Sequence, residues 1–387
     1  WHTASAWEQE DAIKSIQLMG GRVTRIYSLS IVGGIRPLEG GNTLAHLTGP
    51  EQYNEELFKS LDKVLELAGK YGVYLIIPII DEWNWFGGIQ EFAAMYGKTR
   101  SQFFTDSTVK AGFKHLINYL LNRVNTYTGI KYKDDPAILA WELGNELRSA
   151  TDSWIGEMAS YVKQLDGQHL LLSGRDSVTT YDLNNSNIDM ISCHYYSNGS
   201  STFAQRAKND RLKTVNKKPF IIGEFGLVSY EEISDLINES ISNGTAGSLI
   251  WSLRFRNEKG GFYYHNDGAY RSYHYPGFAL NDDYQERQVV SLIIEKAFYV
   301  QGLEPIKPPV PDAPLLFAIA SGNVSWRGST GAMWYVLERS SDGVNWVEIA
   351  SEISDAGKAP FYVETASLHG LYYYRLRAYN ESGYSVY

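Results

Sequence analysis

Residues 73–80 read Val-Tyr-Leu-Ile-Ile-Pro-Ile-Ile, a mostly apolar run without the strict alternation of a half-exposed strand. Such a run is typical of a strand in a parallel sheet that is covered on both faces. Comparable β-branched or apolar runs recur through roughly the first 300 residues, and helix-like amphipathic stretches separate them. The strand-like runs cover residues 22–28, 73–80, 138–143, 169–173, 188–194, 220–224 and 248–253.

This alternation predicts an α/β fold, and its length favours one kind of sheet. Seven strand–helix units in about 300 residues fit a (β/α)8 TIM barrel better than an open sheet. The first strand of such a barrel should precede the helix-like residues 6–19 and is missing from the chain. Because an unpaired barrel edge would be costly, we expect that the chain was truncated before this strand.

The sequence changes character near residue 303, where five prolines between positions 305 and 314 indicate a stiff linker. Short alternating strands and an Asp342-Gly343 hairpin signal follow, and the stretch YYYRLRAYNESGYS resembles the closing hairpin of a fibronectin type III domain. We therefore predict a small all-β fibronectin type III-like sandwich with Trp326, Trp334 and Trp346 in its core. The predicted parts are a barrel domain (1–303), a linker (304–314) and the sandwich (315–387).

The overall composition limits the classes of partner. The 387 residues are 44% hydrophobic, and no run of about 18 apolar residues exists that would insert into a membrane. A net charge of −9 without basic clusters argues against nucleic acid as a partner. Spacings typical of a metal site or of a phosphate-binding loop are absent, so we expect no metal and no cofactor. We also expect a monomer.

Residues 140–146, Ala-Trp-Glu-Leu-Gly-Asn-Glu, place two glutamates four positions apart at the end of one strand. Catalytic groups of a parallel barrel lie at the C-terminal ends of its strands. Glu142 lies inside the strand, roughly 13 Å below Glu146 at about 3.3 Å per residue. A buried ion must be paired, so we interpret Glu142 as a structural carboxylate bonded to an inner Arg or Trp. Glu146 emerges at the rim and is the better candidate for chemistry.

Another glutamate, Glu224, ends the strand-like run 220–224. Two glutamates across a cleft suit the hydrolysis of a glycosidic bond, because one protonates the leaving oxygen while the other attacks the anomeric carbon. Their environments must push their pKa values apart. Arg25, if it reaches Glu224, would keep that carboxylate ionised, and Tyr196 could donate a hydrogen bond to the same oxygen. We therefore predict that Glu224 is the nucleophile and Glu146 the acid/base.

The strand ends Asn-Glu, His-Tyr-Tyr, Gly-Glu-Phe-Gly and Trp, in this order, resemble glycoside hydrolase family 5. The flanks AWELGNE and IIGEFG are most similar to its endo-β-1,4-mannanases, and the resemblance covers roughly residues 6–302. Many family members carry a histidine at the end of the third strand, where this chain reads Pro-Ile-Ile-Asp-Glu-Trp. The resemblance implies that Glu146 and Glu224 are catalytic and that Arg25 and Tyr196 orient Glu224. It also implies that Asn145 binds near the cleavage-site sugar. His194 would line the cleft, and Trp251 would be the surface on which a sugar stacks.

Loop residues complete the predicted cleft. Trp83 and Trp85 lie in the turn-like stretch DEWNWFGG, where an exposed tryptophan suggests a ligand face. His265 lies in the long loop 254–278 and is expected to wall the cleft.

The predicted activity is retaining, endo-acting hydrolysis of a β-1,4-linked polysaccharide, with mannan as the leading substrate. Cellulose or another β-glucan, exo-cleavage and transglycosylation stay open, as does a catalytically silent carbohydrate-binding protein. From the function we infer a secreted, cell-surface or periplasmic location.

Overall fold

The computed structural model describes residues 1–36, 44–197, 199, 201–267, 270–278, 285–366 and 369–387. The chain divides into two compact units. The first unit comprises residues 1–6, 22–226 and 235–250, and the second comprises residues 7–21, 227–234 and 251–387. Among the described helices, none is both long and apolar enough to cross a membrane.

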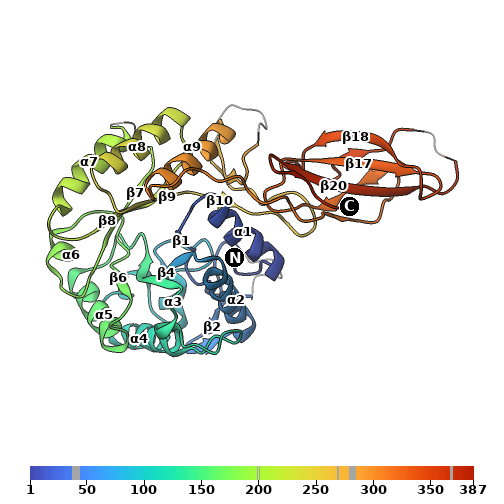
Figure 1. Ribbon diagram of the computed structural model, residues 1–387. Helices are drawn as coiled ribbons and strands as arrows, with labels where there is room; N and C mark the ends of the chain where they lie inside the picture. Colours follow the sequence, from blue (N-terminus) through green and yellow to red (C-terminus); the bar gives the residue numbers. More distant parts are fainter. Residues whose placement is uncertain (37–43, 198, 200, 268–269, 279–284, 367–368) are drawn as a thin grey trace. The chain divides into compact units, whose positions relative to one another are not determined.

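Seven parallel strands form the centre of the first unit, and each lies within or overlaps one of the seven strand-like runs of the sequence (Figure 1). They form two sheets, with the orders β1-β4-β5-β6 and β7-β8-β9. The predicted parallel pairing is therefore confirmed for every neighbouring pair within these sheets. The strands are β1 (Val23–Arg25), β4 (Tyr74–Asp81), β5 (Ile138–Asn145), β6 (Leu170–Leu172), β7 (Ile191–Tyr195), β8 (Phe220–Phe225) and β9 (Gly247–Ile250).

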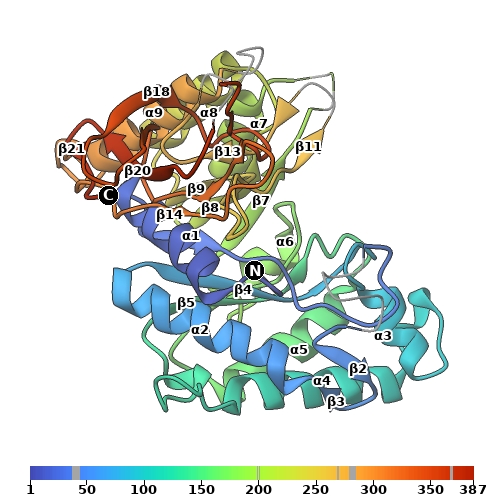
Figure 2. The ribbon, with the colours of Figure 1, turned by 90° about the vertical axis from the view of Figure 1, so that its right-hand side faces the viewer.

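Helices follow most of these strands and lie on their outer side (Figures 1 and 2). Helix α2 shows why: its apolar residues recur at helical spacing and are buried, while the side chain of Asn54 caps its start and Gly72, with a left-handed backbone, ends it. The other elements of this unit are β2 (Leu47–Gly49), β3 (Gln52–Tyr53), α2 (Glu55–Tyr71), α3 (Ile89–Met95), α4 (Ser107–Asn122), α5 (Asp152–Leu165), α6 (Thr180–Asn184), α7 (Phe203–Thr214) and most of α8 (Tyr230–Ser242), with 3-10 turns at Arg100–Gln102 and Tyr132–Asp134.

Apolar side chains fill the space between the strands below their C-terminal ends. Ile76, Ala140, Leu172, Met190 and Ile221, from five successive strands or their approaches, form one buried cluster. Side chains two residues apart on a strand share a face, so on β5 the side chain of Glu142 points to the same side as that of Ala140 in this cluster. The cluster thus supports whatever polar groups the strand ends carry.

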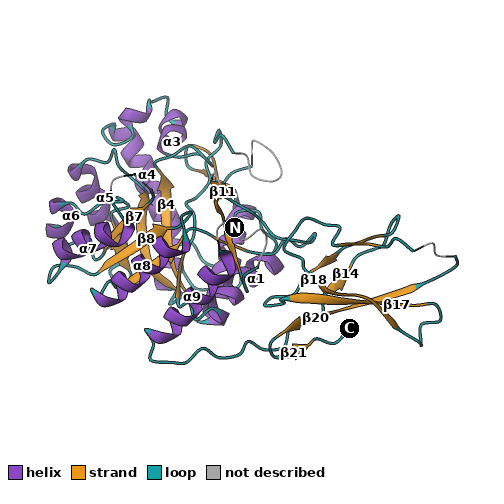
Figure 3. Cartoon of the chain, turned by 90° about the horizontal axis from the view of Figure 1, so that it is seen from above, coloured by secondary structure: helices purple, strands orange, loops and turns teal. Residues whose placement is uncertain are grey.

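The second unit ends in antiparallel strands (Figure 3). A four-stranded sheet has the order β18-β17-β20-β21, and two-stranded pairs β14-β16 and β15-β19 accompany it. The Asp342-Gly343 hairpin is confirmed, since it lies between the paired strands β17 and β18. The strands are β14 (Leu315–Leu316), β15 (Asn323–Val324), β16 (Trp326–Arg327), β17 (Trp334–Ser340), β18 (Val347–Ile353), β19 (Tyr362–Val363), β20 (Tyr373–Asn380) and β21 (Gly383–Tyr384).

The core of these strands differs from the predicted one. Trp326 is fully buried in it, as expected. The prediction was wrong for Trp334 and Trp346, which are only half-buried and lie outside the buried cluster. Trp334 stacks on Tyr379, and the guanidinium of Arg375 lies 4.3 Å from the ring centre of Trp346. The alternation along β17 and β20 sends the rings of Trp334 and Tyr379 to the face opposite the core, whereas Trp346 directly precedes β18.

Within the second unit, a buried arginine connects helix α1 (Ala6–Leu18) to the C-terminal strands. The guanidinium of Arg256 donates to Asp355 at 3.0 Å and to the carbonyl oxygen of Ala332, and it lies 3.6 Å from Asp11 of α1. A buried charge of this kind is stabilised only by such partners. This unit also contains β10 (Leu253–Arg254), β11 (Asn266–Asp267), β12 (Tyr270–Arg271), β13 (Tyr273–His274) and α9 (Glu286–Tyr299).

Candidate active site

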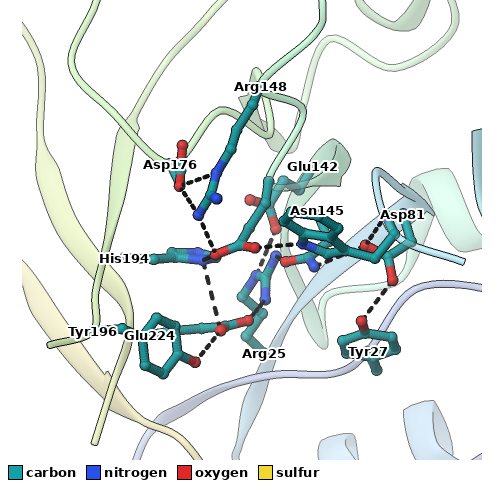
Figure 4. A network of polar contacts seen from close by, with 12 residues as sticks. Arg25, Tyr27, Asp81, Glu142, Asn145, Arg148, Asp176, His194, Tyr196 and Glu224 are labelled. Atoms are coloured by element: carbon teal, nitrogen blue, oxygen red, sulfur yellow. Dashed lines mark hydrogen bonds and ion pairs between the residues drawn. The ribbon is translucent and has the colours of Figure 1, made fainter. Parts of the chain in front are cut away.

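Polar side chains from the C-terminal ends of β1, β4, β5, β7 and β8 meet in the first unit (Figure 4). Arg25, Asn145, Glu146, His194 and Glu224 belong to this group, as the sequence predicted. Glu146 directly follows β5 and has a left-handed backbone with φ of 53°. Non-glycine residues in this conformation are strained and often lie at functional sites.

Arg25 connects the base of the site to one of its glutamates. Its Nε donates to Glu142 at 2.6 Å, its Nη1 to Glu224 at 2.7 Å and its Nη2 to Asn145 at 2.8 Å. Burial opposes the charge of Arg25, but Glu142 and Glu224 outweigh it and raise the pKa of the guanidinium. Both expectations are confirmed: Glu142 is a paired structural carboxylate, and Arg25 reaches Glu224.

Glu224 accepts hydrogen bonds on both carboxylate oxygens. Arg25 occupies Oε1, and the hydroxyl of Tyr196 donates to Oε2 at 2.5 Å. The predicted contact from Tyr196 exists, but it reaches the oxygen opposite to the one that Arg25 holds. Burial, followed by the neighbouring charge of Glu224, raises the pKa of Tyr196, so its hydroxyl remains a donor.

Glu146 is surrounded by donors as well. The indole Nε1 of Trp83 donates to Oε2 at 2.6 Å, Nδ1 of His194 lies 3.0 Å from Oε1, and Nη2 of Arg148 lies 3.4 Å from the same oxygen. Burial raises the pKa of this carboxyl, but the hydrogen bond and charge of His194, with Trp83 and Arg148, more than offset it and leave a pKa of about 2. With these partners in place, Glu146 is therefore ionised at ordinary pH.

His194 lies between the two glutamates. Its Nδ1 is 3.0 Å from Glu146 and 3.6 Å from Glu224. Burial lowers the pKa of His194, but the charges of Glu224 and Glu146 outweigh it and raise the pKa above 6.5. Interacting groups titrate as a unit, so the His194–Glu146 pair holds its last proton up to this raised pKa.

The two glutamates are close enough to act on one bond. One ligand atom each from Glu146, His194 and Glu224 lies within 4.8 Å of the other two. A metal ion would accept such a set of ligands. However, Arg25 already contacts Glu224 and Arg148 contacts Glu146, so guanidinium groups supply positive charge here. We interpret the group as one that moves protons.

The sequence did not indicate four of the residues in this network: Tyr27, Asp81, Arg148 and Asp176. Tyr27 and Asp81 form a hydrogen bond of 2.5 Å, and Asp81 also accepts from Asn145 at 2.9 Å. Arg148 pairs with Asp176 at 2.6 Å. All four lie at or just beyond strand ends, and Tyr27 and Arg148 each lie two positions after a predicted site residue. That spacing is the signal that would have found them.

The remaining predicted residues, Trp85, Trp251 and His265, have other contacts. Trp85 is 40% exposed, and the guanidinium of Arg36 lies 4.5 Å from its ring centre. Trp251 and His265 belong to the second unit, where their rings contact each other at 5.9 Å. Their part in a substrate cleft stays a prediction, as does that of Trp85.

Fold and site together define an α/β protein that presents two neighbouring glutamates at the ends of parallel strands, an arrangement typical of glycosidases. The model of a family described as GH family 5 β-mannosidase-like matches residues 11–220, more than half of the chain. The chain belongs to glycoside hydrolase family 5.

Curated relatives agree with this family. Mannan endo-1,4-β-mannosidase 4 of Solanum lycopersicum is 34% identical over 50% of this chain and 57% of its own length. Mannan endo-1,4-β-mannosidase 1 of Oryza sativa subsp. japonica is 33% identical over 60% of this chain and 67% of its own length. The chain thus spans little more than half of the tomato protein.

Solved structures share the fold. An endo-β-1,4-mannanase from Thermotoga petrophila has a TM-score of 0.62 at 21% identity, and the match covers 99% of this chain and 94% of that one. A family 5 mannosidase from Rhizomucor miehei has a TM-score of 0.62 at 20% identity over 76% of this chain and 88% of that one. The Thermotoga match extends over the C-terminal strands as well.

Proposed function

We propose that this protein is a retaining endo-β-1,4-mannanase in which Glu224 is the nucleophile and Glu146 the acid/base. The observation that carries the proposal is the short separation of the two glutamates, with an oxygen of each within 4.8 Å. Retaining glycosidases hold their carboxyl groups about 5–5.5 Å apart, whereas inverting enzymes need about 6.5–9.5 Å to admit a water. The names of the curated relatives favour mannan over glucan as the substrate.

The contacts support the following chemical steps. Glu224, paired with Arg25, attacks the anomeric carbon while the glycosidic oxygen leaves with the proton of the His194–Glu146 pair. A covalent glycosyl-enzyme results. The pair, now without its proton, takes one from water, whose oxygen attacks the same carbon and releases the sugar with Glu224 restored. Asn145 contacts the sugar next to the reacting carbon.

A panel of polysaccharides with product sizing and anomer analysis tests the proposal. We expect β-mannan to be cut internally into oligosaccharides, with the β-anomer formed first. Glu224→Ala should abolish turnover and leave the fold intact. Initial α-anomer would refute the double displacement, cleavage confined to β-glucans would replace mannan, and binding without new reducing ends would favour a silent carbohydrate-binding protein.

We also propose that the seven parallel strands belong to a (β/α)8 barrel and that the C-terminal strands are a fibronectin type III-like domain. Their order and pairing support this reading. We further propose a secreted, cell-surface or periplasmic location, which follows from the proposed action on a polysaccharide, and a monomeric state. Size-exclusion chromatography with light scattering would test the monomer.

A further inference from the structure

The carboxamide of Asn145 is fixed from both ends. Nη2 of Arg25 donates to its Oδ1 at 2.8 Å, and its own Nδ2 donates to Oδ1 of Asp81 at 2.9 Å. A carboxamide has two orientations of similar shape, in which oxygen and nitrogen exchange places. Because a guanidinium only donates and a carboxylate only accepts, these two neighbours permit one of them.

Asp81 is itself held firmly. It ends β4, lies opposite Asn145 in the register of the sheet, and is fully buried. Besides Asn145, its Oδ1 accepts from the backbone nitrogen of Trp83 at 3.2 Å, and its Oδ2 accepts from the hydroxyl of Tyr27 at 2.5 Å. Three donors on one buried carboxylate leave it little freedom to turn.

We propose that Asp81 is a positioning residue that acts through Asn145, with Tyr27 holding Asp81 in place. The Nδ2 of Asn145 carries two hydrogens. One is directed to Asp81, which aims the other at the hydroxyl on C2 of the sugar being cleaved. Hydrogen bonds to this hydroxyl strengthen in the transition state of glycoside hydrolysis. The inference rests on the proposed function, in which Asn145 contacts that sugar.

Comparing two substrates isolates this role. The first is an aryl β-mannobioside, and the second is the same compound without the 2-hydroxyl on the sugar that carries the aryl group. We expect Asp81→Leu to lower kcat/KM on the first substrate about 10- to 100-fold, mostly through kcat, since a reacting group displaced by about 1 Å costs rate of this order. On the second substrate, the loss should be about twofold at most, because no 2-hydroxyl is present to be misplaced.

Two milder variants keep the test independent of folding. Asp81→Asn can still offer Asn145 an oxygen if its amide nitrogen turns toward Tyr27, and Tyr27→Phe removes one of the three donors to Asp81. In both variants kcat/KM should again fall more on the substrate with the 2-hydroxyl than on the substrate without it, but the fall should be smaller than in Asp81→Leu. Asp166→Asn is the matched control: it is a buried carboxylate that accepts from Trp141 and His169, outside the site. It should leave the ratio between the substrates unchanged.

The outcomes separate the inference from the proposed function. Equal losses on both substrates would mean that Asp81 acts through Arg25 and Glu224, and no loss on either would mean that Asn145 needs no support. Each result overturns the inference alone. A wild-type protein that turns over neither mannosides nor glucosides would overturn the proposed function and the inference with it.

Discussion

Replacing His194 by glutamine should move the alkaline limb of the pH–activity profile to lower pH. In the native site Glu146 has a pKa of about 2, against an ordinary value of 4.5, although its burial acts in the opposite direction. This difference corresponds to about 3 kcal/mol in favour of the ionised form, at 1.36 kcal/mol per pKa unit. His194 is the first of the groups that supply it. Without its charge, burial pushes the pKa of Glu146 upward.

The two proteins hold the catalytic proton on different groups. In the wild type, the His194–Glu146 pair keeps its last proton to a pKa above 6.5, so kcat/KM should fall only above that pH. In His194→Gln, Glu146 alone must hold the proton. Its pKa rises but stays below that of the native pair, and we expect the limb to move down by about one pH unit or more.

The assay measures kcat/KM for an aryl β-mannobioside between pH 4 and 9. Measurements are spaced by about one pH unit, and more closely along the alkaline limb. His169→Gln is the control, because this histidine also pairs with a carboxylate, Asp166 at 2.7 Å, and also has a raised pKa, but lies outside the site. Its profile should match the wild type. An unmoved alkaline limb in His194→Gln would refute the shared proton, even if the maximal rate fell.

Three further substitutions test the supporting structure. Gly174→Ala should lower kcat/KM at least about tenfold. The reason is that φ at Gly174 is 83° and an added Cβ would lie 2.1 Å from the carbonyl oxygen of Gly144 in β5. Gly167→Ala is the control, because open space surrounds that position. Asp62→Leu should lower the free energy of unfolding by about 3 kcal/mol, measured by denaturant titration, because it strips the buried Arg123 of two hydrogen bonds. His46→Phe should make stability less sensitive to acid. Burial lowers the pKa of His46 to about 3, so the unfolded chain binds more protons between pH 6.5 and 3, and about 2 kcal/mol of native stability is lost from pH 6.5 to 4.5.

Each of these has a result that would contradict it. A fully active Gly174→Ala variant would mean that β5 can shift without moving its glutamate. An unchanged denaturation midpoint for Asp62→Leu would mean that Glu55 and Tyr119, which also accept from Arg123, suffice. Equal acid sensitivity of the wild type and His46→Phe would place the acid-labile group elsewhere.

Periodicity explains why the strands of the first unit were predictable. Continuous apolar runs mark strands that are buried on both faces, and each such run contains or overlaps a parallel strand. The strand ends then brought Arg25, Glu146, His194 and Glu224 together in the prediction, because the C-terminal ends of parallel strands meet on one side. Glu142 was predictable as a structural carboxylate because its position inside the strand buries it, and a buried charge needs a partner.

Contacts that depend on loops could not be predicted in this way. The contact of Trp83 with a sugar stays a prediction. The hydrogen bond from its indole nitrogen to Glu146 was not predicted, because it depends on the conformation of the loop after β4. Which oxygen of Glu224 Tyr196 reaches depends on side-chain rotation. The burial of Trp334 and Trp346 was wrong because aromatic residues on a sheet also pack on its outer face against arginines.

The different roles of the two glutamates can be argued from their donors. Both are buried, both accept on both oxygens, and each contacts a guanidinium. Glu224 receives its shortest hydrogen bonds from Arg25 and Tyr196, whose pKa values are raised, so neither donor loses its proton at ordinary pH. Glu146 instead shares a hydrogen bond with His194, whose imidazolium, unlike a guanidinium or a buried phenol, can give up its proton. A carboxylate whose donors never release a proton is suited to attack, and one whose donor can hand over a proton is suited to protonate the leaving oxygen.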